Sequence, residues 1–91
     1  MSNVEFLVHE VNYDEEGTRV SGIVNKGKVS LNTKFLSLLD ESGAAIHVAL
    51  RVSRIIAYRR EIGELPTGMS GELCVAGDGA TQLEKHRMLT D

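Results

Sequence analysis

The amino-acid sequence predicts an all-β protein that folds as a small, closed, antiparallel β-barrel of about six strands. Short stretches alternate between apolar and polar residues, turn-forming residues separate these stretches at regular intervals, and no stretch has the period of an amphipathic helix. The chain has 91 residues, which is the length of one domain. We therefore expect a single barrel that spans residues 1–91.

The first two strands are expected at residues 4–11 and 18–25. Residues 4–11 are rich in β-branched and aromatic side chains, and a polar turn over residues 12–17 follows them. Successive residues of a strand point to opposite faces, so one face of the second strand carries small and apolar residues: Thr18, Val20, Gly22 and Val24. A glycine inside a strand weakens it, so we expect Gly22 to permit tight coiling or the close approach of another backbone.

The next segments alternate between turns and a short strand. Residues 26–28 (Lys-Gly-Lys) form a turn, and residues 31–33 form a second bend. The apolar run 35–39 is a strand, and it ends at the turn-forming residues 40–43. This spacing of turns suits hairpins of an antiparallel barrel.

Residues 46–58 are expected to form the longest strand. The sequence predicts that one of its faces carries Val48, Leu50, Val52, Ile56 and Tyr58. Arg54 falls on the same apolar face, which is an unfavourable place for a charge. A β-bulge near this position would turn the arginine outward, so we expect a bulge there.

The remainder is expected to contain two further strands. Residues 59–71 form a long connection with the only proline, residues 72–76 form a short strand, and residues 77–79 turn the chain. A loop through Lys85 leads to a last strand at residues 87–90.

Charge is distributed unevenly along the chain. Residues 1–18 carry five acids and no base, residues 19–60 carry eight bases and two acids, and the rest is acidic again, for a net charge of −3. The basic middle segment either forms a face for an anionic partner or has its charges neutralised by neighbouring strands. The sequence leaves both alternatives open, and we favour neutralisation.

Apolar runs are too short for a membrane-spanning helix, and the N-terminus lacks the layout of a signal peptide. The single cysteine, Cys74, forms no internal disulfide, which agrees with a reducing compartment. We expect a cytoplasmic protein that does not bind membranes, with Cys74 as a small core residue.

No motif for catalysis, metal binding or cofactor binding is complete. Gly17 and Gly22 have the spacing of the glycines in a P-loop, but Ile23 follows where that loop needs a lysine. The candidate metal ligands do not have ligand spacing: His9, His47, His86 and Cys74. Cys74 lies in mid-strand without an adjacent base. We therefore expect no enzyme activity, no cofactor and no metal.

The run Gly17–Val29 resembles the start of the second domain of translational GTPases such as elongation factor Tu. In that family a Gly-Thr-Val-Val-x-Gly-x-Val-x-x-Gly-x-Val pattern precedes an apolar strand. Residues 49–60 and 65–77 look like the long strand, the glycine-bearing loop and the buried strand of that domain, and residues 85–89 lie where the family has its closing Arg-Gly-x-Val-Leu motif. The resemblance implies a translation-factor β-barrel, present here without the nucleotide-binding domain, in which five glycines have structural roles: Gly17, Gly22, Gly27, Gly68 and Gly71.

Two departures from the family pattern concern single residues. Asn32-Thr33 stands where the family has a glycine in a bend, and asparagine tolerates left-handed backbone conformations. His86 replaces the glycine of the closing motif.

The resemblance implies a binding or adaptor module. We expect a protein partner, bound through the connection 59–70 or at an exposed strand edge. The alternative is an RNA-binding or ribosome-associated protein, since arginine beside an aromatic residue suits nucleic acid; a second copy of the chain is a further candidate partner. The candidate partner-binding residues are Lys26, Lys28, Arg54, Tyr58, Arg59 and Arg60. Arg51 and Arg54 would otherwise pair with Glu5, Glu10 or Glu72.

Overall fold

The computed structural model describes residues 3–14 and 17–91. This part of the chain contains nine strands and one short 3-10 helix, η1 (Ala80–Gln82). The strands are β1 (Glu5–Asp14), β2 (Gly17–Lys26), β3 (Lys28–Ser30), β4 (Lys34–Leu39), β5 (Ala45–Ala57), β6 (Arg60–Ile62), β7 (Glu64–Pro66), β8 (Ser70–Asp78) and β9 (Met88–Thr90). Within the described residues, no helix is long and apolar enough to cross a membrane.

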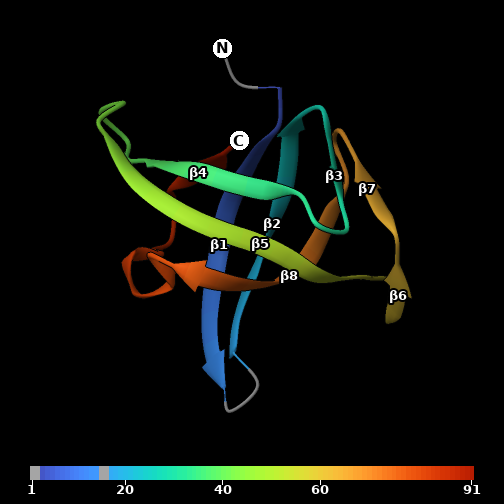
Figure 1. The fold of residues 1–91 in the computed structure, drawn as a ribbon. Coiled ribbons are helices and arrows are strands. Elements are labelled where there is room, and N and C mark those ends of the chain that lie inside the picture. The colour runs from blue at the N-terminus through green and yellow to red at the C-terminus, as the bar shows by residue number, and fades with distance from the viewer. Residues whose placement is uncertain (1–2, 15–16) are drawn as a thin grey trace.

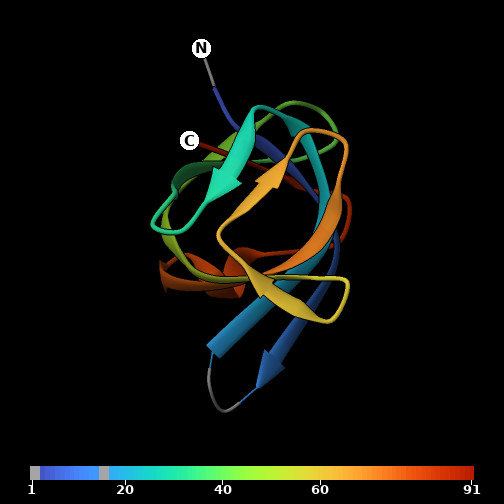
Figure 2. The same ribbon diagram turned by 90° about the vertical axis from the view of Figure 1, so that its right-hand side faces the viewer.

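Six strands form a closed antiparallel ring (Figures 1 and 2). Their order is β4-β9-β1-β2-β8-β5, and β5 pairs with β4 to complete the circle. Strand β6 extends the sheet beyond β5, and β3 pairs with β7 in a separate two-stranded ribbon. The prediction of a small closed antiparallel barrel is confirmed, with three short strands added to the ring.

The barrel interior is filled by aliphatic and aromatic side chains from every strand of the ring. The largest side chains that are fully buried are Phe6, Phe35, Leu38, Leu50, Ile55, Leu65, Leu73 and Leu89. Each such side chain contributes about 1.5–3 kcal/mol by leaving water. Val29 of β3 and Leu65 of β7 are paired and fully buried, so the β3–β7 ribbon covers part of this core.

The predicted face of β2 is confirmed, because Thr18, Val20, Gly22 and Val24 all point into the barrel and are buried. Gly22 lies where β1 and β2 come very close together. A Cβ atom on this residue would lie 1.9 Å from the carbonyl oxygen of Leu7. The register of β1 against β2 also shifts between Val8 and Glu10. The close approach predicted for Gly22 is therefore present.

The bulge expected near Arg54 is present, since the register of β5 against β8 shifts between Val52 and Arg54. Arg54 is consequently exposed. The assignment of Ile56 and Tyr58 to the core face was wrong, because the bulge reverses the alternation beyond it. Ile55 and Ala57 are buried instead, while Tyr58 is 80% exposed.

The connection predicted over residues 59–71 contains two strands, β6 and β7, and the start of β8. These strands were missed because each of the first two has only three residues, which is too short to show alternation. Gly77 lies within β8 and not in the predicted turn. The bend predicted over residues 31–33 is present, and Asn32 has a left-handed backbone with a φ angle of 71°. His86, which replaces the glycine of the closing motif, also has a left-handed backbone, with a φ angle of 69°.

Candidate functional site

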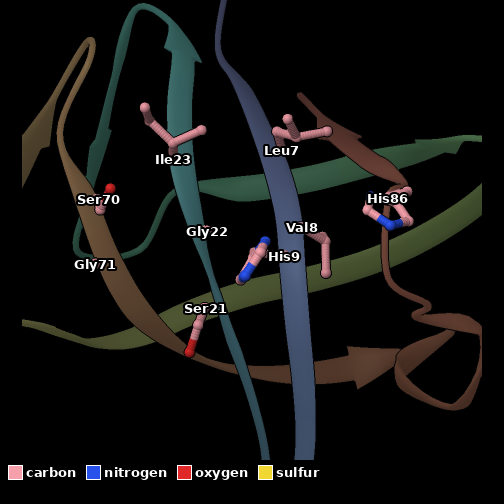
Figure 3. A pocket seen from close by; sticks show the side chains of 9 residues that line it. All are labelled: Leu7, Val8, His9, Ser21, Gly22, Ile23, Ser70, Gly71 and His86. Carbon is pink, nitrogen blue, oxygen red and sulfur yellow. The ribbon is translucent and has the colours of Figure 1, made fainter.

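A hollow with a volume of about 520 Å³ lies on the outer surface of the ring. Figure 3 shows its residues on three adjacent strands, β8, β2 and β1, with His86 in the segment that leads to β9. The lining residues are Leu7, Val8, His9, Ser21, Gly22, Ile23, Ser70, Gly71 and His86. Below we call this set the β1–β2–β8 hollow. Its volume lies within the range of about 300–1,000 Å³ that small-ligand pockets have.

Two glycines from distant parts of the sequence shape this hollow. Gly22 of β2 and Gly71 of β8 are register partners. A Cβ atom on Gly71 would lie 2.9 Å from the Leu65 side chain and 3.1 Å from the Ile56 carbonyl oxygen. The strands pack closely at this pair, and the small side chains of Ser21 and Ser70 lie beside the two glycines in the lining of the hollow. The wall of the barrel is therefore thinly covered here.

Apolar side chains stand at the edge of the hollow. Leu7 is 36% exposed and Ile23 is 37% exposed, and they are cross-strand partners on β1 and β2. The polar groups are His9, His86 and the two serine hydroxyls. The backbone of His86 is fixed because its N–H donates to the Val8 carbonyl at 2.9 Å, so the loop before β9 forms a stable side of the hollow.

The six predicted partner-binding residues do not line the β1–β2–β8 hollow. Tyr58 and Arg59 form the two-residue turn of the β5–β6 hairpin, in which Ala57 pairs with Arg60. Both turn residues have positive φ angles, 53° and 64°, as a type I′ turn requires. Tyr58, Arg59 and Arg60 are exposed, and we call these three residues the hairpin tip.

The other three predicted residues lie elsewhere or are paired. Arg54 Nε lies 2.6 Å from Glu61 Oε1, and Glu61 is a partner that the sequence did not lead us to expect. Glu72 contacts Arg19 instead, at 3.5 Å. Lys28 Nζ lies 3.2 Å from Glu64 Oε1, and Lys26 is exposed at the end of β2. The structure therefore brings together Tyr58, Arg59 and Arg60 and separates them from the lysines of the β2–β3 turn.

Cys74 was wrongly predicted to be a core residue. Its neighbours Leu73 and Val75 point inward, while Cys74 is half-buried beside its register partners Arg19 and Arg54. Burial raises the pKa of its thiol, and the two nearby arginines only partly oppose this effect. A raised pKa keeps the thiol protonated, which makes it a poor nucleophile at neutral pH.

A second hollow, of about 330 Å³, lies between the β4–β5 turn and the segment before β9. Its carboxylate Asp40 Oδ1 accepts hydrogen bonds from the Ser42 hydroxyl at 2.7 Å, the Ser42 N–H at 2.9 Å and the Ala44 N–H at 3.0 Å. These bonds, led by that of the Ser42 hydroxyl, lower the pKa of Asp40. The carboxylate is thus engaged in building the turn. Within residues 3–14 and 17–91, no group of three or more His, Cys, Asp or Glu side chains suits a metal ion.

Comparison with known proteins identifies the fold. No family model matches the sequence, and no curated protein matches it. Among solved structures, the chain is similar to translation elongation factor SelB from Methanococcus maripaludis in its apo form, with a TM-score of 0.80 and 20% sequence identity over 97% of this chain. The fold is that of a translation elongation factor domain.

A second solved structure with this translation-factor fold is the bacterial selenocysteine-specific elongation factor EF-Sec, with a TM-score of 0.75 and 17% identity over 98% of this chain. The chain spans only 18% of the SelB chain and 14% of the EF-Sec chain. The resemblance seen in the sequence is therefore confirmed for the fold.

Sequence reasoning missed the β1–β2–β8 hollow. The available signal was a small polar residue beside each of two glycines, Ser21-Gly22 and Ser70-Gly71. These two pairs of residues predict a hollow only once β2 and β8 are known to be neighbours in the sheet.

Proposed function

We propose that this chain is a non-catalytic binding module whose β1–β2–β8 hollow receives a segment of a partner protein. The observation that carries the proposal is the combination of a thinly covered wall with exposed apolar side chains, Leu7 and Ile23, beside it. Exposed apolar surface next to a concave site favours the docking of an apolar side chain from a partner.

The fold supports a binding role. Two solved structures with this fold are elongation factors, in which the corresponding domain is a small part of a longer chain. A domain of this kind acts through its surfaces, and the β1–β2–β8 hollow, at about 520 Å³, is larger than the hollow beside the β4–β5 turn. Strand addition at an exposed edge was the second predicted mode of binding. The outermost strand of the ring sheet, β6, has only three residues and can form few backbone hydrogen bonds with an added strand.

The proposal includes no reaction. Cys74 has a raised thiol pKa, and the residues around its crevice include no histidine to act as a base: Asp14, Gly17, Arg19 and Arg54. Nucleophilic catalysis needs a nucleophile within hydrogen-bond reach of a base.

Replacing Ile23 by aspartate tests this proposal. The wild-type chain and the variant are each used to retain partner protein from an extract of the native cell. We expect the variant to retain about tenfold less partner than the wild type, because a charged group would have to be desolvated at an apolar contact. The retained proteins are identified and quantified by mass spectrometry, after RNase treatment that removes contacts mediated by RNA.

Leu36→Asp is the matched control, because Leu36 is also an exposed apolar residue, 45% accessible, but lies on β4 outside the hollow. Both variants are first compared with the wild type by thermal unfolding. Equal retention by the wild type and Ile23→Asp, or an equal loss in both variants, would show that the hollow is not the docking site.

A further inference from the structure

We propose that Tyr58, Arg59 and Arg60 bind single-stranded nucleic acid, with a base stacked on Tyr58 and phosphates held by the two arginines. The contacts, backbone and charges of this hairpin support the proposal.

The backbone of the tip is strained for the residues that it contains. Tyr58 and Arg59 both have left-handed backbones, with φ angles of 53° and 64°. Two-residue hairpin turns of this kind prefer Asn-Gly, Asp-Gly or Gly-Gly. Strained positions of non-glycine residues cluster at functional sites. A tyrosine and an arginine at this turn do not help the hairpin to form, so we attribute their presence to their side chains.

The positive charge of the tip is not neutralised within the described residues. The two glutamates closest in sequence are engaged by other bases, Glu61 by Arg54 at 2.6 Å and Glu64 by Lys28 at 3.2 Å. No ion pair of Arg59 or Arg60 occurs in the described part of the chain. Two guanidinium groups are thus free to bind an anion at the end of the hairpin.

The exposed tyrosine distinguishes nucleic acid from other anions. Tyr58 is 80% exposed, the highest value among the exposed large apolar side chains of the described residues. An acidic peptide would be attracted by the arginines but would leave this ring without a partner. A base can stack on the ring while adjacent phosphates contact guanidinium groups, which is how proteins bind single strands without sequence preference.

Fluorescence anisotropy with a labelled oligoadenylate RNA of about 12 nucleotides, and with the DNA of the same sequence, tests the proposal at low salt. We expect the wild type to bind both strands. Tyr58→Asn should weaken binding by about tenfold or more through lost stacking, whereas Tyr58→Phe should bind as the wild type does. Asparagine tolerates a left-handed backbone, so Tyr58→Asn should be at least as stable as the wild type in thermal unfolding.

The charge contribution is measured by salt dependence. For single strands, each neutralised phosphate contributes about −0.7 to the slope of log affinity against log salt concentration, so Arg59→Ala with Arg60→Ala should reduce the magnitude of the slope by about 1.4. Lys34→Ala with Lys85→Ala is the matched control, because it removes two exposed positive charges that are not part of the tip and should leave stacking intact.

Three results would overturn the proposal. The first is that the wild type does not bind at low salt, and the second is that the tip variants bind as tightly as the wild type. The third is that polyglutamate of equal charge competes as well as RNA does, which would show that any acidic polymer suffices. A higher affinity for RNA than for DNA would identify RNA as the preferred ligand of the tip. Ile23→Asp should leave this binding unchanged, so the outcome is separate from that of the hollow.

Discussion

Replacing Gly22 by alanine is expected to lower the free energy of unfolding by about 3 kcal/mol or more, or to prevent folding. A Cβ atom at this position would lie 1.9 Å from the carbonyl oxygen of Leu7 and 3.0 Å from the ring of Phe6. The first contact is with the backbone of β1, which cannot rotate away as a flexible side chain would. To admit the methyl group, β1 and β2 would have to separate, and this would weaken the strand pairing on which the ring and the hollow both depend.

Urea unfolding, followed by far-ultraviolet circular dichroism, measures this effect. Gly63→Ala is the matched control, because a Cβ atom on Gly63 would contact nothing within 4 Å and its backbone is not left-handed. Alanine at position 63 reduces the conformational freedom of the unfolded chain. We therefore expect this control to raise the free energy of unfolding by less than about 1 kcal/mol. If the two variants unfold at the same urea concentration, the close approach of β1 to Gly22 is absent.

Replacing Phe35 by alanine is expected to lower the free energy of unfolding by about 3–5 kcal/mol, because it removes a large, fully buried side chain and leaves a cavity. The adjacent residue Leu36 is 45% exposed and points outward from the same strand. Leu36→Ala should therefore cost less than about 1 kcal/mol. The two substitutions together test which side chains of β4 point into the barrel. This orientation depends on the register in which β4 pairs with β5 and β9 to close the ring.

Chemical denaturation of both variants supplies the comparison, with Phe35→Leu as a milder substitution in case Phe35→Ala does not fold. Phe35→Leu should lie between the wild type and Phe35→Ala in stability. Equal losses at positions 35 and 36 would mean that β4 is not seated in the barrel as described.

The sequence predicted the ring well where alternation is uninterrupted. In β2, four consecutive inward positions are small or apolar, and all four are buried. The bulge in β5 was also predictable, because an arginine stood on an otherwise apolar face. Beyond that bulge the prediction failed for Ile56 and Tyr58, since the bulge changes which residues face inward and its position is set by pairing with β8.

The candidate sites were harder to predict than the fold. The hollow depends on the pairing of Gly22 with Gly71, which lie on strands far apart in the sequence. The hairpin tip was foreseen as part of a group of basic and aromatic residues that also included Arg54. The pairing of Arg54 with Glu61 was not foreseen, because it arises only when β6 folds back on β5. The sequence predicts which charged and aromatic residues could bind a partner. The pairing of strands then determines which of the charged residues lack an ion-pair partner within the chain.

Site-specific photo-crosslinking tests most directly whether the β1–β2–β8 hollow is a docking site. A photoreactive phenylalanine analogue is placed at Ile23 in one variant and at Leu36 in another, and each is irradiated in the native cell. We predict a discrete protein adduct from position 23 that is absent from position 36. The same adducts from both positions, or none from position 23 in a folded variant, would contradict the account.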